Sequence, residues 1–216
     1  MSQSPKKGGK VAVRSVVDST NTTTTTPLDY SFKDLCHIAD LTEEEPRNGP
    51  KPHSITNVEV AKSTEEREPA AHAQAVVKKY KTNALRLNNN ALTEIVGFFE
   101  VTSTILCQPE CLSWVDLSFN RLKTIDPVFV ELTELKVLYL HGNEIDKILE
   151  VDKLSQLPKL KSLTLHGNPI ETGNREAYKQ YVVATVPQLK TFDFSGITKS
   201  DRATASRRLL MKTSKA

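Results

Sequence analysis

Hydrophobic and polar positions repeat along the chain from residue 84 onwards. Four segments fit one pattern, L-x-L-x-x-N-x-L with Val or Ile allowed for Leu, and they read LRLNNNAL (85–92), VDLSFNRL (115–122), LYLHGNEI (138–145) and LTLHGNPI (163–170). The asparagines of the pattern lie 30, 23 and 25 residues apart. Four matches in a fixed order indicate that one short structural unit has been repeated.

Each unit begins with a short predicted strand. Apolar residues alternate within it, as Leu138 and Leu140 do, which is the two-residue period of a strand. The asparagine follows where the chain leaves the strand, and its amide can pair with backbone groups that would otherwise be buried unpaired. We expect these residues to form a structural ladder of Asn90, Asn120, Asn143 and Asn168. A period of roughly 20–29 residues is typical of leucine-rich repeats. The sequence therefore predicts an α/β leucine-rich-repeat solenoid with a parallel concave sheet and short convex helices.

The open ends of a solenoid have to be covered. At the C-terminal end the sequence predicts a helical cap, with a helix over about 175–185 followed by a final strand. That strand would belong to a fifth, partial repeat in which Phe192 and Phe194 replace inward leucines. The irregular first repeat is predicted to hold a helix over about 98–106.

Residues 1–82 show no sustained period and contain six of the eleven prolines. We expect them to form a mostly extended N-terminal arm, with a short helix near 65–81 as the candidate cover for the N-terminal end. An apolar and aromatic island within the arm should order against the main domain or on a partner, and its candidate binding residues are Leu28, Tyr30 and Phe32. The predicted division is thus arm 1–82, repeat domain with cap 83–200, and basic tail 201–216.

Composition and charge narrow the class of protein. No apolar run approaches the roughly twenty residues of a membrane span. Three cysteines without a secretion signal favour reduced thiols and a cytoplasmic address. The net charge of +3 is unevenly distributed, because residues 196–216 carry six basic side chains and one acidic side chain. Such a tail can attract acidic surfaces, or it can simply be solvated.

Several motifs outside the generic repeat carry a more specific resemblance. They are PLDYSF (27–32), EEPR (44–47), DLSFN (116–120), IDPV (125–128), VLYLHGN (137–143) and TFDFSGITKSDR (191–202). Together they resemble the family of leucine-rich-repeat-containing protein fifty-one, and the closing segment resembles the cap shared by phosphatase-regulator repeats, the splicing factor U2 A-prime and the axonemal dynein light chain. The resemblance implies a small, non-catalytic cytoplasmic protein of the cilium or flagellum, with axonemal proteins and possible contact with tubulin among its partners.

The outward positions of the predicted strands are the candidate protein-binding site. Exposed Trp, Tyr and Arg in the centre of a face are the residue types that anchor protein interfaces. The candidate residues of this concave face are Arg86, Trp114, Asp116, Tyr139, His141, Thr164 and His166. The alternative is that the segment containing Leu28 and Phe32 covers Trp114.

No phosphate loop, nucleophile elbow or dinucleotide fingerprint occurs. His141 and His166 share a column, but a third metal ligand is missing from it, so neither metal nor cofactor is expected. We therefore expect no enzyme, no small-molecule substrate and no membrane contact. The resemblance implies a protein-binding scaffold of the axoneme. One alternative is a regulatory subunit that recruits an enzyme such as a protein phosphatase through the concave face. A ribonucleoprotein adaptor is less favoured, because no aromatic-basic platform for nucleic acid is visible.

Overall fold

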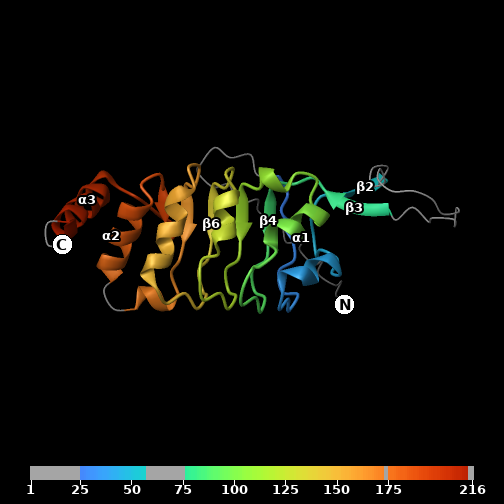
Figure 1. Ribbon diagram of the computed structural model, residues 1–216, viewed down its shortest axis with the longest axis horizontal. Coiled ribbons are helices and arrows are strands. Elements are labelled where there is room, and N and C mark those ends of the chain that lie inside the picture. The colour runs from blue at the N-terminus through green and yellow to red at the C-terminus, as the bar shows by residue number, and fades with distance from the viewer. Residues whose placement is uncertain (1–24, 57–75, 173–174, 214–216) are drawn as a thin grey trace, which may run out of the picture.

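The computed structural model describes residues 25–56, 76–172 and 175–213, which form one curved solenoid (Figure 1). Its main sheet has seven strands in the order β1-β4-β5-β6-β7-β8-β9. They are β1 (Leu28–Asp29), β4 (Ala84–Arg86), β5 (Trp114–Asp116), β6 (Val137–Tyr139), β7 (Ser162–Thr164), β8 (Thr191–Phe192) and β9 (Ser195–Gly196). All neighbours pair in parallel except β8 and β9, which are antiparallel.

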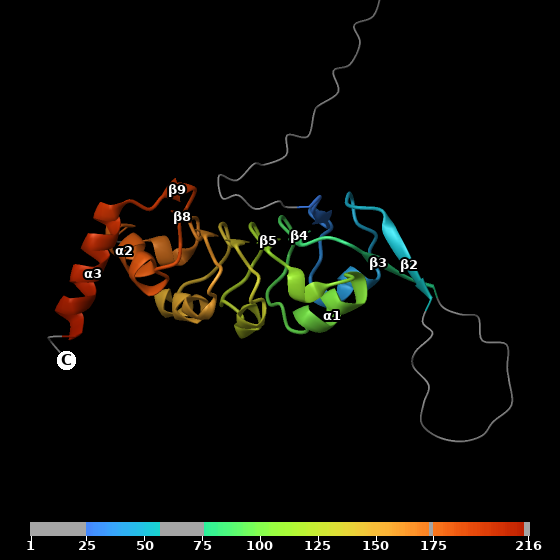
Figure 2. The same cartoon turned by 90° about the horizontal axis from the view of Figure 1, so that it is seen from above.

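The convex side consists mostly of short 3₁₀ segments. They are η1 (Ile38–Thr42), η2 (Pro109–Cys111), η3 (Pro127–Glu131), η4 (Ile148–Gln156) and η5 (Pro169–Glu171), and they are joined by helix α1 (Phe98–Ile105). Figure 2 shows the sheet on one side of the solenoid and these segments on the other. One continuous core lies between them and contains the alternating inward leucines, such as Leu138 and Leu140, which are both 0% exposed. The predicted solenoid, its parallel sheet and its helix near 98–106 are confirmed.

The C-terminal end is closed by helix α2 (Arg175–Thr185), as the sequence predicted. Tyr178 and Val182 of this helix are buried in the core beside Phe192. Helix α3 (Lys199–Thr213) follows and packs against α2. Because α3 extends to Thr213, most of the predicted basic tail, residues 201–216, is helical. Lys179 of α2 lies 2.8 Å from Asp201 of α3 and joins the two helices by an ion pair.

At the N-terminal end the structure differs from the predicted extended arm. Strand β1 pairs with β4, placing Leu28 opposite Leu85. The buried apolar residues of this segment, Leu28, Tyr30, Leu35, Ile38 and Leu41, have the same spacing as Leu85, Leu87, Leu92, Ile95 and Phe98 of the next repeat. Residues 28–41 are therefore an additional repeat. It extends the core beyond the predicted boundary at residue 83, because its own apolar stripe is buried against the following repeat.

A two-stranded ribbon projects from this end. It consists of β2 (Pro52–Thr56) and β3 (Val76–Tyr80), which are antiparallel. The predicted helix near 65–81 is therefore wrong for residues 76–80, where Val76 and Val77 favour a strand; residues 65–75 lie outside the described residues. In the described part of the chain, no helix has the length and apolar character needed to cross a bilayer.

Candidate functional site

The asparagine ladder fixes the edge of the concave face. The side-chain amide of Asn143 donates to the carbonyls of Leu117 and Leu140, at 3.0 and 2.9 Å. Its Oδ1 accepts from the backbone N–H of Leu122 at 3.0 Å. Asn120 and Asn168 make the corresponding contacts one repeat away on either side. Each asparagine thus ties two consecutive repeats together through backbone groups.

Asn90 extends the ladder into the N-terminal repeat. Its amide donates to the carbonyls of Tyr30 and Leu87, and its Oδ1 accepts from the backbone of Lys33 and Leu35. The side chains of Leu28 and Tyr30 are 0% and 1% exposed. Of the two predicted alternatives, order on a partner or order against the main domain, the second holds for both residues, because they occupy the inward column of the additional repeat. Phe32 is 61% exposed.

The strand register brings together the candidate residues of the concave face. Arg86, Asp116, Tyr139 and Thr164 lie opposite one another on β4 to β7. Several are less exposed than the sequence suggested, since Trp114 and Asp116 are 8% exposed, His141 is 9% and Thr164 is 0%. Trp114 packs with Ala84, Val137 and Tyr139 in a cluster separate from the main core. Neither Leu28 nor Tyr30 belongs to this cluster.

Ring contacts join these side chains into a continuous group. The Trp114 and Tyr139 rings are 5.7 Å apart, and the imidazoles of His141 and His166 stack at 4.7 Å. The guanidinium of Arg86 lies 5.5 Å from the Trp114 ring. We call the group the aromatic row; its members are Trp114, Tyr139, His141, His166, Phe119 and Phe194.

Phe194 enters the row from an unexpected direction. The final parallel strand ends at Phe192, and Asp193 and Phe194 then form a turn with φ of 47° and 59°. The Phe194 side chain was expected to face the core, but the turn places its ring 5.5 to 5.7 Å from Tyr139, His141 and His166. It is 63% exposed. The row therefore has an apolar side chain held above the sheet by a hairpin.

Phe119 was missed because it lies outside the strand pattern, directly before Asn120. The residue before each asparagine has a left-handed backbone, with φ of 56° at Asn89, 53° at Phe119, 69° at Gly142 and 71° at Gly167. Left-handed φ is unfavourable for a bulky residue. Phe119 occupies this backbone conformation all the same. Its side chain is 53% exposed, and its ring lies edge-on to His141 at 5.1 Å. The glycines at 142 and 167 were the available signal that this column needs positive φ.

The polar groups of the concave face are held by internal hydrogen bonds. Asp116 accepts from the backbone N–H and the hydroxyl of Ser118, at 3.0 and 2.6 Å. Burial raises the pKa of the Asp116 carboxyl, although Ser118 partly opposes the shift. Burial, followed by the nearby His166, lowers the pKa of His141, whose Nδ1 lies 2.8 Å from the Thr164 hydroxyl. At neutral pH the lowered pKa favours the uncharged imidazole of His141.

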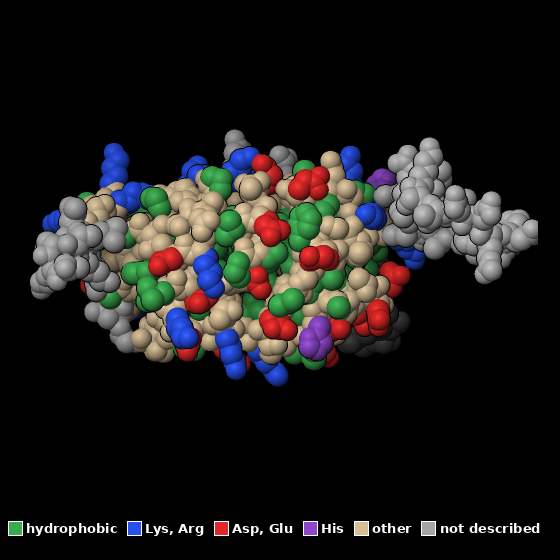
Figure 3. Space-filling view, in the orientation of Figure 1, with side chains coloured by type: hydrophobic (Ala, Val, Ile, Leu, Met, Phe, Trp, Pro, Cys, Tyr) green, Lys and Arg blue, Asp and Glu red, His purple; other side chains and the backbone are tan. Residues whose placement is uncertain are grey.

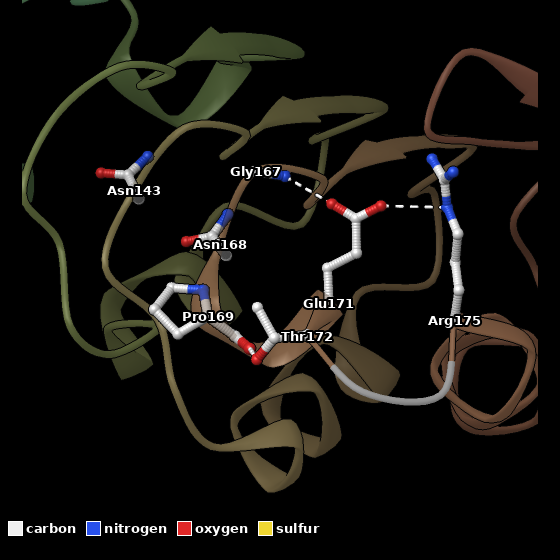
Figure 4. A pocket seen from close by; sticks show the side chains of 7 residues that line it. All are labelled: Asn143, Gly167, Asn168, Pro169, Glu171, Thr172 and Arg175. Atoms are coloured by element: carbon white, nitrogen blue, oxygen red, sulfur yellow. Dashed lines mark hydrogen bonds and ion pairs between the residues drawn. The ribbon is translucent and has the colours of Figure 1, made fainter.

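A separate pocket of about 590 Å³ lies by the last asparagines (Figure 4). Figure 4 shows Glu171 between Gly167 and Arg175, and the Glu171 carboxylate accepts from the Gly167 N–H at 2.8 Å and pairs with Arg175 at 3.0 Å. The amides of Asn143 and Asn168 point to the ladder carbonyls. The main polar groups of this pocket already have partners, so the aromatic row is the better candidate site.

Comparison with known proteins gives matches to leucine-rich-repeat proteins. A protein-family model described as "Leucine-rich repeat" matches residues 106–216. Leucine-rich repeat-containing protein 51 of Rattus norvegicus is 48% identical over 179 residues, which cover 83% of this chain and 82% of that protein. The Homo sapiens protein of the same name is 46% identical over 192 residues, covering 88% and 89%.

A solved structure shows the same fold. A chain of the Drosophila melanogaster SNF/U2A′ complex matches with a TM-score of 0.50 at 23% identity, covering 61% of this chain and 75% of that one. At this identity the likeness concerns the fold alone. The repeats form a protein-binding domain. The two relatives named above match along most of this chain and most of their own length. The chain therefore belongs to the leucine-rich repeat-containing protein 51 family.

Proposed function

We propose that this protein is a non-catalytic scaffold or adaptor of the ciliary or flagellar axoneme, and that it binds its partner through the aromatic row. The observation that carries the proposal is the exposure of Phe119 and Phe194, at 53% and 63%, on a row that continues to Trp114. Exposed apolar side chains that belong to one continuous group of rings often mark protein interaction sites, which supports a binding role for this row.

The geometry of the row suits a binding anchor. Central aromatic residues surrounded by other contacts commonly contribute about 2 kcal/mol or more to an interface. Phe119 and Phe194 each contact a neighbouring ring, and such contacts reduce the side-chain freedom that would be lost when a partner docks. Their left-handed backbones are unfavourable for folding, and strain of this kind is concentrated at functional positions.

The axonemal address rests on the family resemblance of the motifs within residues 27–202. It predicts axonemal proteins, with tubulin as a candidate, as partners. The alternative is a regulatory subunit that recruits an enzyme, and a diffuse cytoplasmic address would favour it. A relative from Caenorhabditis elegans, "Probable U2 small nuclear ribonucleoprotein A'", is 29% identical over 105 residues, 48% of this chain and 41% of that protein. A nuclear address would favour a ribonucleoprotein role instead.

The test is incorporation of tagged variants into axonemes, followed by extraction with increasing salt. We expect the parent to localise to the axoneme and the double variant Phe119→Gly, Phe194→Gly to be lost or extracted at much lower salt. The control is Leu149→Ala, because Leu149 is a 65% exposed apolar side chain in η4 on the convex side. Normal incorporation of the double variant would rule out the aromatic row as the binding element, and a non-axonemal parent would rule out the address.

A further inference from the structure

The edge where the concave strands begin carries a row of lysines. Lys136, Lys161 and Lys190 directly precede β6, β7 and β8. They occupy equivalent positions, because the Lys161 N–H donates to the Lys136 carbonyl at 2.8 Å and the Lys190 N–H donates to the Lys161 carbonyl at 2.7 Å. Adjacent strands lie about 4.8 Å apart, so three cationic side chains start from one short edge. We call these three residues the lysine ladder.

The lysine ladder borders the aromatic row. Each of its lysines is followed directly by a concave residue, namely Val137, Ser162 or Thr191. Val137 packs with Trp114 and Tyr139. The equivalent positions before β4 and β5 are the uncharged Asn83 and Ser113, so the lysines of this column are confined to the half of the sheet that also holds Phe194.

The positive charge of the ladder is not neutralised within the described part of the chain. Five lysines elsewhere form ion pairs, among them Lys159 with Glu134 and Lys179 with Asp201. Lys136 and Lys190 make no ion pair with a described residue, and the Lys161 ammonium donates at 3.4 Å to the Gln188 carbonyl.

The carboxylates of the concave face are already engaged. Asp193 accepts from the backbone N–H groups of Leu165 and His166 and from the Tyr178 hydroxyl. Asp116 is bonded to Ser118, and Asp29 accepts from the Ser31 N–H and lies 3.5 Å from Arg86. A ligand that extends to the starting edge of β6 to β8 therefore meets cations that form no ion pair within the described residues, next to a face that carries an exposed apolar group.

We propose that the partner presents an acidic peptide segment with a large apolar side chain, and that this segment lies across β6 to β8. Its carboxylates contact the lysine ladder while the apolar side chain packs on Phe194 and Tyr139. This rests on the proposed function and specifies the chemistry of the partner. The N-terminal residues 1–17 of the chain carry four basic side chains and no acidic one, so this segment does not complement the ladder.

The chain contains its own reporter for the test. Trp114 is the only tryptophan, and it lies in the aromatic row. The probes are tryptophan-free synthetic peptides of about twelve residues, with a central leucine flanked by glutamates, the same peptide with lysines for glutamates, and the glutamate peptide with serine for leucine. A single-stranded oligonucleotide of equal charge is the fourth probe. Trp114 emission of the full chain is titrated with each, up to about 1 mM.

We expect saturable binding of the glutamate–leucine peptide, weaker binding of the serine peptide and none of the lysine peptide. Raising the salt from about 0.05 M to about 0.5 M should weaken binding, because exposed charges are screened. Lys136→Glu with Lys161→Glu should lower the affinity roughly tenfold or more. The matched charge reversal Lys123→Glu with Lys147→Glu, at exposed lysines outside the ladder, should leave it within about twofold.

The proposal is overturned if the glutamate–leucine peptide gives no saturable change, if both double charge reversals act alike, or if the oligonucleotide binds more tightly than the peptide. The axoneme experiment on Phe119 and Phe194 distinguishes this failure from failure of the proposed function. Loss of incorporation in the glycine variant together with no binding of the acidic peptide would keep the aromatic row as the site and reject only the acidic partner.

Discussion

Two neighbouring columns of the repeat are under opposite constraints. The asparagine column is uniform from Asn90 to Asn168, and every member donates to at least two backbone carbonyls. The column one residue earlier holds Asn89, Phe119, Gly142 and Gly167, although the same left-handed backbone is required at each position. Where the backbone depends on a side chain, the residue type does not vary. Where the backbone requires only positive φ, a phenylalanine stands at a position that glycine would occupy more easily.

The difference separates what folds the molecule from what is available for binding. Asn120 and Phe119 are adjacent in the sequence. Asn120 is 6% exposed and makes hydrogen bonds to the backbone through both its Oδ1 and its Nδ2, whereas Phe119 is 53% exposed and contacts His141. On the face shown in Figure 3, hydrophobic, acidic and basic side chains are interspersed. The aromatic row differs from such a mixed surface because ring contacts connect its members, with Phe119 and Phe194 both packed against His141.

The largest effect is expected in the N-terminal repeat, where the same contrast occurs two residues apart. Tyr30 is 1% exposed in the core, whereas Phe32 is 61% exposed with φ of 56°. Tyr30→Ala should lower the free energy of unfolding by about 3–5 kcal/mol, while Phe32→Gly should leave it nearly unchanged. Urea denaturation measures both. Equal losses would show that the repeat does not have the inward and outward columns described.

Asn143→Ala comes next. It removes three buried hydrogen bonds and leaves the carbonyls of Leu117 and Leu140 without this donor. The expected loss is about 3 kcal/mol. Replacing the exposed Lys147 by alanine is the control and should change the unfolding free energy little. If Asn143→Ala melts with the parent, the ladder does not hold the repeats together.

Gly142→Ala tests the left-handed column itself. An added Cβ would lie 2.6 Å from the Phe119 ring, and the φ of 69° is unfavourable for alanine. We expect a loss of about 2 kcal/mol. In a Phe119→Gly background the collision disappears and only the backbone strain remains, so a double-mutant cycle should show coupling of about 1 kcal/mol. Additive effects would contradict the contact between the two positions.

The smallest effect concerns pH. Burial and His166 lower the pKa of His141 in the folded state, so the unfolded chain takes up this proton first as the pH falls below about 6.5. Stability from this residue should therefore decrease from about pH 6.5 downwards, until the folded pKa is passed. Urea unfolding across that range should show a shallower pH dependence for His141→Asn. An unchanged dependence would assign it to other groups.

Much of the fold could be predicted from the sequence, because Asn120, Asn143 and Asn168 recur with apolar residues at fixed offsets. The N-terminal repeat escaped detection for two reasons. Lys33 stands where its asparagine would be, and 57 residues separate Leu28 from Leu85, far beyond the usual repeat period.

The candidate site was only partly predictable. Strand alternation located Trp114 and Tyr139, because their direction follows from the period of two. It could not locate Phe194, whose direction depends on a turn at Asp193 and Phe194 that lacks the Asn-Gly or Asp-Gly signature. Nor could it show that Thr164 is fully buried, since this depends on packing between repeats.

The central claim is that Phe119 and Phe194 serve binding and do not hold the fold together. Its most direct test is the unfolding free energy of the Phe119→Gly, Phe194→Gly variant, measured on the same preparation that is used for incorporation into axonemes. Glycine suits the positive φ at both positions and completes an Asp-Gly hairpin turn, so the account predicts stability equal to the parent or higher by up to about 1 kcal/mol, together with loss of incorporation. A fall in stability of several kcal/mol with the same loss would contradict it, because the two phenylalanines would then be part of the fold.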